Sequence, residues 1–244
     1  MKIKKHIWRL QQAIVCPVVP VAALRDLRGV SALAELRIFF EKIDRMRFIS
    51  HLDLNRAFTR ALFASHLPVW FTEGFNRHPH LVFGQPLPLG MAGERETLDL
   101  RMNEEVDGSL VKEKLNEQLP DGIRVVDANP PQHAHKDINF ARYRIEMDKK
   151  YFDTFSRFWD AESILSEKKT KRSIITVDLK KEVQELSTDV QGDYLVIHAV
   201  MPCSFECSIG PAVLLRAFEK AIGTEVFTYQ TREGFLLQDY SNFN

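Results

Sequence analysis

Hydrophobic and polar positions follow two different periods along the chain, and the order of these periods predicts the fold. Residues 97–102 alternate apolar with polar side chains, which is the period of a half-buried strand. Residues 106–119 instead space their apolar side chains three and four positions apart, as in a helix with one buried face. The first half of the chain predicts, in order, a strand at 35–43, a helix from 51, strands at 69–71 and 97–102, a helix at 106–119 and a strand at 122–126.

The same order of elements returns after a short polar segment. Residues 129–137 contain two prolines and two histidines but no large apolar side chain, which indicates a linker. The second half then predicts strands at 140–147, 173–179 and 194–200, helices at 151–161 and 210–222, and extended segments at 224–237. Strand, helix, strand, strand, helix, strand is the split βαβ, or ferredoxin-like, order. We therefore predict an α+β fold of two ferredoxin-like units, at 34–128 and 138–244, whose antiparallel sheets carry their helices on one face.

Residues 1–33 fit neither unit. Three lysines precede an apolar run at 13–24, the order found in a signal peptide, but Pro17 and Pro20 interrupt the run. No stretch reaches the roughly 18 uninterrupted apolar residues that a membrane span requires. We expect an N-terminal extension and no contact with a membrane.

Composition indicates a reducing compartment and predicts no net electrostatic attraction for anions or cations. Lysine plus arginine and aspartate plus glutamate both number 33, so an anion site has to come from local clustering. Three cysteines make no disulfide framework, which indicates the cytoplasm. Only Cys203 and Cys207 lie close together, too few thiols for an iron–sulfur cluster, so we expect them to pack as small apolar groups and expect no cofactor.

One helix has a well-defined start and a basic face. Ser50 is a good N-cap, and Asp53 three residues later completes a capping box. Arg56 and Arg60 lie four residues apart on the face opposite the apolar positions, and Pro68 ends the helical pattern. We predict an exposed, arginine-bearing helix.

The loop that follows, residues 74–90, is rich in glycine, proline and polar side chains, which is typical of a functional loop. Together with Arg56 and Arg60, it supplies an anion-binding surface on which Phe75 or Trp70 would stack on a base. The loop residues assigned to this surface are Gly74, Phe75, Asn76, Arg77, His78 and His80. The alternative is that both aromatic rings are core and that the arginines are merely solvated.

Histidines offer two further interpretations. His51 and Asp53 are weak candidates for an acid and a base, although the capping box already accounts for Asp53. The pairs 78/80 and 133/135 have a spacing that would suit a metal site, but histidines in polar loops are common, and we assign no metal.

The stretch from residue 48 to residue 90 resembles a family of bacterial proteins described as radical-SAM-linked, a domain of unknown function found beside or fused to cobalamin-type radical SAM enzymes. The matching residues are Phe48, Ser50, His51, Leu52, Asp53, Arg56, Arg60, Leu67, Pro68, Gly74, Phe75, Asn76, Pro79, Pro86, Leu87, Pro88 and Gly90. Arg77 replaces a proline of the family pattern, and His80 replaces a lysine or arginine. The resemblance extends over about residues 36–235 and implies a radical SAM protein as partner.

The function expected from these features is that of an accessory protein, which binds RNA or another phosphate-bearing substrate for a radical SAM enzyme. Two alternatives stay open: a metal-free RNA-processing enzyme that uses His51, and a pure protein–protein adaptor.

Overall fold

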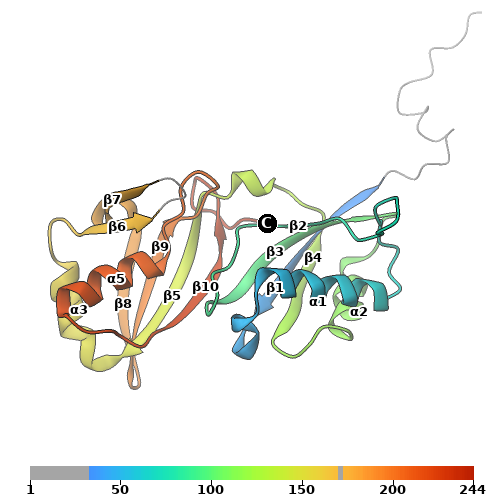
Figure 1. The fold of residues 1–244 in the computed structure, drawn as a ribbon. Coiled ribbons are helices and arrows are strands. Elements are labelled where there is room, and N and C mark those ends of the chain that lie inside the picture. Colours follow the sequence, from blue (N-terminus) through green and yellow to red (C-terminus); the bar gives the residue numbers. More distant parts are fainter. Residues whose placement is uncertain (1–32, 170–172) are drawn as a thin grey trace, which may run out of the picture.

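The structure, a computed structural model, describes residues 33–169 and 173–244 (Figure 1). The predicted N-terminal extension lies, apart from residue 33, outside the described residues. The strands are β1 (Ala34–Lys42), β2 (Leu81–Phe83), β3 (Ala92–Met102), β4 (Ile123–Asn129), β5 (Phe140–Asp148), β6 (Leu165–Lys169), β7 (Ile174–Asp178), β8 (Glu185–Gln191), β9 (Tyr194–Pro202) and β10 (Tyr229–Leu236). The α-helices are α1 (His51–Ala64), α2 (Gly108–Asn116), α3 (Phe152–Trp159), α4 (Leu179–Glu182) and α5 (Pro211–Ile222). Short 3-10 helices are η2 (Asp44–Phe48), η3 (His135–Asp137) and η4 (Lys149–Tyr151).

A single mixed sheet runs through both halves of the molecule. Its strand order is β4-β1-β3-β10-β5-β9-β8, with β2 also paired to β3. All of its pairs are antiparallel except β3 with β10. The predicted α+β class with a mostly antiparallel sheet is confirmed, whereas the expectation of two separate sheets is wrong.

The two halves join because β3 is longer than its partner β2. Residues 98–100 of β3 pair with β2, and residues 92–93, at the other end of the same edge, pair with β10. Within the N-terminal half the order is β4-β1-β3-β2, and within the C-terminal half it is β10-β5-β9-β8. The division into domains at 34–128 and 138–244 stays a prediction.

Two predicted strands have a different place in the structure. The strand expected at 173–179 is β7, which forms a separate hairpin with β6 instead of joining the main sheet. Its expected place is taken by β8, an edge strand with mostly exposed side chains, for which no strand was predicted. Residues 69–71 make only isolated bridges, from Val69 to Met102 and from Phe71 to Pro79, and the short strand of this half is β2.

The start and the buried face of α1 are as predicted. The Asp53 N–H donates to Ser50 Oγ at 3.1 Å, and the Ser50 hydroxyl donates to the Asp53 carboxylate at 2.7 Å. The helix ends at Ala64, four residues before Pro68. Its buried residues are Leu54, Phe58, Ala61 and Leu62. They pack with α2 against the apolar face of β1, and each large side chain buried there contributes roughly 1.5–3 kcal/mol.

The C-terminal half has its own core beneath α3 and α5. Phe155 of α3 and Phe218 of α5 meet edge to face, with ring centroids 5.2 Å apart. Pro211 opens α5, and Gly223 closes it in the left-handed conformation (φ +73°) that glycine adopts without strain. Cys203 is buried in this core, as predicted, and burial raises the pKa of its thiol.

A buried ion pair crosses the junction of the two halves. Arg232 of β10 donates from Nε to Glu96 Oε1 of β3 at 2.8 Å, and from Nη2 to the Gln85 carbonyl at 2.7 Å. Both charged side chains are almost inaccessible to solvent. Removing either partner would leave the other charge buried and uncompensated, so the junction depends on both residues. Among the described residues, no helix is both long and apolar enough to cross a membrane.

Candidate functional site

The exposed side of α1 carries two arginines and an aromatic ring in one row. At about 100° per residue, Arg56, Arg60 and Phe63 lie within roughly 60° of one another around the helix. All three are exposed, Phe63 to 52%. The buried stripe of the same helix faces the sheet, so this row faces away from it.

Aromatic contacts connect this row to the following loop. The Phe63 ring stacks on Phe71, with centroids 4.6 Å apart and planes 29° apart. The Arg77 guanidinium lies 6.0 Å from the centroid of the Phe71 ring. We call the set Arg56, Arg60, Phe63, Phe71 and Arg77 the arginine surface. The structure thus brings the predicted helix and loop arginines to one side of the molecule.

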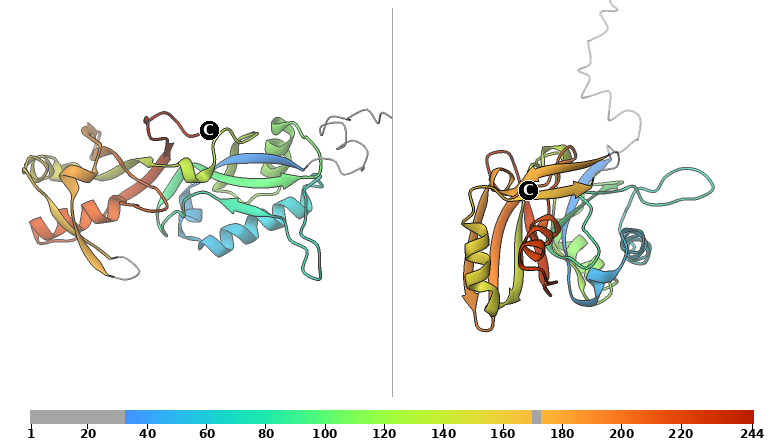
Figure 2. Two further views of the ribbon diagram at one scale, coloured as in Figure 1. Left: turned by 90° about the horizontal axis from the view of Figure 1, so that it is seen from above. Right: turned by 60° about the vertical axis from the view of Figure 1, so that its left-hand side comes forward.

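The loop is braced by its own hydrogen bonds. The Thr72 N–H donates to the His78 carbonyl at 2.9 Å, and the His78 N–H donates to Thr72 Oγ1 at 3.2 Å. Gly74 permits the sharp turn at the tip, where φ is +115°. Phe75 is fully exposed at that tip, and the loop projects from the body of the protein (Figure 2). The backbone carbonyl oxygen of Asn76 lies 2.9 Å from His78 Nδ1.

Two of the three arginines on this surface have no carboxylate partner among residues 33–169 and 173–244. Arg56 pairs with Asp53, with Nη1 and Oδ1 3.3 Å apart in an exposed position. Arg60 donates from Nε to the Arg56 carbonyl at 3.3 Å, and Arg77 lies over Phe71. The hydrogen bond from Ser50 and the nearby Arg56 lower the pKa of Asp53, so the pair is charged at neutral pH. The Arg60 and Arg77 guanidinium groups therefore retain donors for an anion.

Of the two aromatic candidates, Phe75 is the accessible one. Trp70 is only half-buried, but its faces have neighbours: the Arg101 guanidinium at 6.0 Å and the His80 ring at 6.4 Å between centroids. His80 thus packs beside Trp70 at the base of the loop, away from the tip.

His51 lies on a different side of α1 from the arginine surface. Its ring meets Phe83 edge to face at 4.9 Å, and it is about 140° around the helix from Arg56. It borders a recess of only about 10 Å³, whose other polar walls are Lys42, Gln85, Glu96 and Thr97. A recess of that size holds one water molecule. His51 and the arginines therefore do not share a pocket.

The charged residues of this recess and of the junction were missed by sequence reasoning. Lys42 is almost fully buried and donates to the carbonyls of Arg47 and Ile49 at 3.3 and 3.2 Å, and burial lowers its pKa. Lys42 lies two residues after the buried Phe40 on β1, and Glu96 lies two residues before the buried Leu98 on β3. A charged residue in phase with a buried strand face was the available signal.

The histidine pairs occupy separate surroundings. His135, in the predicted linker, is buried beside Asp99, with Nε2 and Oδ1 3.5 Å apart, and Arg37 binds the same carboxylate at 2.7 Å. Burial lowers the pKa of His135, so it is neutral at neutral pH. His78 belongs to the projecting loop instead. In the described part of the chain, no three histidine, cysteine or acidic side chains are grouped to hold a metal.

Comparison with known proteins identifies the family. A family of uncharacterized proteins conserved in bacteria (DUF2344) matches residues 35–211, which is 177 of 244 residues. No curated protein matches the chain. The matched segment includes the whole arginine surface. The description of the family names no activity, and the radical SAM association stays a prediction. The chain belongs to the DUF2344 family of bacterial proteins.

Proposed function

We propose that the protein is a non-catalytic accessory protein that binds RNA, or another phosphate-bearing substrate, on the arginine surface. The observation that carries this proposal is the row of contacts from Phe63 through Phe71 to Arg77. It puts on one side the guanidinium groups of a helix and a loop, of which Arg60 and Arg77 have no carboxylate partner in the described part of the chain. Guanidinium groups bind phosphate oxygens in a bidentate manner, and the exposed Phe75 ring beside them offers a face on which a base stacks.

The architecture supports this reading by analogy. We infer that each half is a split βαβ unit. In both halves the sheet order is the fourth, first, third and second main-sheet strand of that half, and all pairs within each half are antiparallel. Folds of this kind often bind single-stranded RNA. The radical SAM partner and the cytoplasmic location rest on the family resemblance and on composition alone.

Binding is favoured over cleavage by the position of His51. A general base has to come within hydrogen-bond reach of the group that it deprotonates. A phosphate held by Arg60 and Arg77 would lie on the other side of α1 from the His51 ring, which packs on Phe83. Asp53, the predicted partner of His51, is engaged by Ser50 and Arg56.

The test is a binding titration with matched arginine variants. Fluorescence anisotropy of a labelled single-stranded RNA of about 12 nucleotides would be measured at several salt concentrations. We expect Arg60→Ala with Arg77→Ala to weaken binding about tenfold and to lower the slope of log affinity against log salt by about 0.7 per arginine. Arg157→Ala is the control, because Arg157 is exposed on α3 and makes the same type of bond, from Nε to the Asp153 carbonyl at 3.3 Å.

Two results would contradict the proposal. Unchanged affinity of the double variant would remove the arginine surface as the binding site. RNA cleavage by the wild-type protein that disappears in His51→Ala, while binding persists, would replace the accessory role with the enzymatic one.

A further inference from the structure

The C-terminal half presents a second charged surface, on the sheet face that its helices leave open. The helices pack on the other face, through Phe155 and Phe218 among others. On β5, Arg144 and Glu146 lie on either side of the buried Ile145, so they belong to the open face. Residues paired across strands share a face, which places the neighbouring strands' side chains in register with them. The carboxylates of this open face are Glu94, Glu146, Asp148, Glu185, Asp189 and Glu233.

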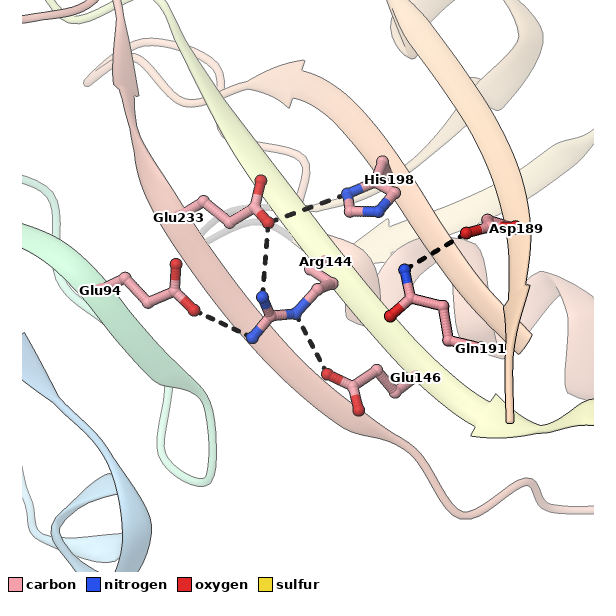
Figure 3. Close-up of polar contacts among 7 residues, drawn as sticks. All are labelled: Glu94, Arg144, Glu146, Asp189, Gln191, His198 and Glu233. Atoms are coloured by element: carbon pink, nitrogen blue, oxygen red, sulfur yellow. Dashed lines mark hydrogen bonds and ion pairs between the residues drawn. The ribbon is translucent and has the colours of Figure 1, made fainter. Parts of the chain in front are cut away.

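These carboxylates outnumber the cations among them. Arg144 alone is shared by Glu94 at 2.9 Å, Glu146 at 3.1 Å and Glu233 at 3.8 Å (Figure 3). Its guanidinium lies between side chains from β3, β5 and β10, and one positive charge cannot neutralise three negative ones. His198 of β9 approaches the same Glu233, with Nδ1 and Oε1 3.8 Å apart. The other cations at this face are Arg142 of β5 and Lys150, whose Nζ lies 3.5 Å from Asp148 Oδ2. The six carboxylates still outnumber Arg142, Arg144 and Lys150, so the open face keeps a negative excess.

An aromatic hollow adjoins the acidic strands. It has a volume of about 530 Å³ and is shared with the open face through Glu146 and Asp148. Tyr194 and Phe227 line it with 56% and 87% of their surfaces exposed. Large exposed rings beside a cavity are a favourable contact for the aliphatic stem of a lysine or arginine, while the carboxylates receive its charge. Glu225 and Asp193 add carboxylates to the wall, and Lys150 adds one cation.

We propose that the open face and this hollow together form a docking surface for a lysine- or arginine-rich segment of a partner protein. The choice of occupant follows from charge complementarity: the excess of carboxylates attracts a cationic segment and repels the phosphates of a nucleic acid. The basic side chains of the segment bind Glu94, Glu146 and Glu233, and one of them enters the hollow against Phe227. This inference is independent of the proposed function, because no residue of the arginine surface takes part in it.

The test uses a fluorescein-labelled lysine-rich peptide of about 12 residues, with a glutamate-rich peptide of the same length as the charge control. We expect the full chain to bind the lysine-rich peptide with an affinity that falls as salt rises, and not to bind the control. Glu146→Gln with Glu233→Gln should weaken binding about tenfold, and Phe227→Ala about fivefold. Phe227→Ala keeps the test valid if the double variant is unstable, because this ring is almost fully exposed.

Glu104→Gln with Glu105→Gln is the matched control, since both residues are exposed in the N-terminal half. Equal affinity of wild type and both site variants for the peptide would overturn the proposal, and so would an equal loss in the control variant. Self-association of the wild type that is lost in the site variants would also overturn it, because the occupant would then be a second copy of the chain.

Discussion

The two halves of the molecule share one strand order and carry opposite charged surfaces. In the N-terminal half, the charged surface is built on the outer side of a helix and on a projecting loop, and it is cationic at Arg60 and Arg77. In the C-terminal half, it is built on the uncovered face of the sheet and is anionic around Arg144. The same order of elements therefore carries two surfaces of opposite charge, because surface chemistry depends on which side chains the elements expose.

Two local surfaces of opposite sign are compatible with the zero net charge of the chain. A chain with equal numbers of acidic and basic residues attracts neither nucleic acid nor a basic peptide over long distances. Each surface acts only at short range, within the Debye length of about 8 Å at physiological salt. Under the two proposals above, each half binds its own partner.

The largest effect is expected at the junction, where the ion pair of Glu96 and Arg232 connects the two halves. Glu96→Gln leaves Arg232 buried without its counter-charge, so we expect the free energy of unfolding in urea to fall by about 3–5 kcal/mol. Replacing both residues, Glu96→Leu with Arg232→Met, should recover part of the loss, because no unpaired charge is then buried.

The control for this change is an exposed pair in the same half. Lys114→Ala breaks the pair with Glu117, whose two side chains are 38% and 48% exposed, and should change stability by less than about 0.5 kcal/mol. A Glu96→Gln protein as stable as wild type would show that the ion pair does not join the halves.

Two exposed aromatic residues sharpen the comparison of the surfaces. Phe75→Ala removes the ring at the loop tip and should weaken single-stranded RNA binding by about 1–3 kcal/mol, the contribution of one base stack. It should leave binding of the lysine-rich peptide unchanged, and Phe227→Ala should show the reverse. Anisotropy titrations of both variants with both ligands measure these effects. A variant that weakens the binding of both ligands equally would mean that one surface binds both.

The start of α1 provides a smaller effect, on stability. Ser50→Ala removes the oxygen that accepts the Asp53 N–H, so we expect a loss of about 1 kcal/mol in the free energy of unfolding. Ser50→Thr keeps the acceptor and should recover most of it. Thermal or urea unfolding measures both, and an unchanged Ser50→Ala protein would mean that the cap does not stabilise α1.

The smallest expected effect is a gain at the start of α5, in the other half. Gly210 precedes α5 in an extended conformation (φ −109°, ψ 176°) and has no side chain to cap the helix. An added Cβ meets no atom within 4 Å, so Gly210→Ser should stabilise the protein by a few tenths of a kcal/mol, about the difference between serine and glycine at an N-cap. Gly210→Ala is the control without an acceptor, and equal stability of the two variants would argue against capping.

Local signals were sufficient to predict much of the N-terminal half. The start of α1 at His51 was predicted from the Ser50 N-cap, and its buried residues were predicted from the helical spacing of apolar side chains. Both signals extend over only a few residues. Strand β8 was missed because it is an edge strand whose exposed polar residues leave no buried period to detect. The β7 segment was assigned to the wrong sheet because a short extended run does not specify its neighbour.

The sequence alone determined the class of elements, the capped helix and the types of residue in the arginine-bearing loop, because these depend on contacts a few residues apart. Only the tertiary structure decided that one sheet joins the halves, that Glu96 meets Arg232 across 136 positions, and that carboxylates from three strands gather around Arg144. Pairings of that kind depend on which distant strands lie side by side. Residue spacing along a single strand does not encode the identity of its neighbour.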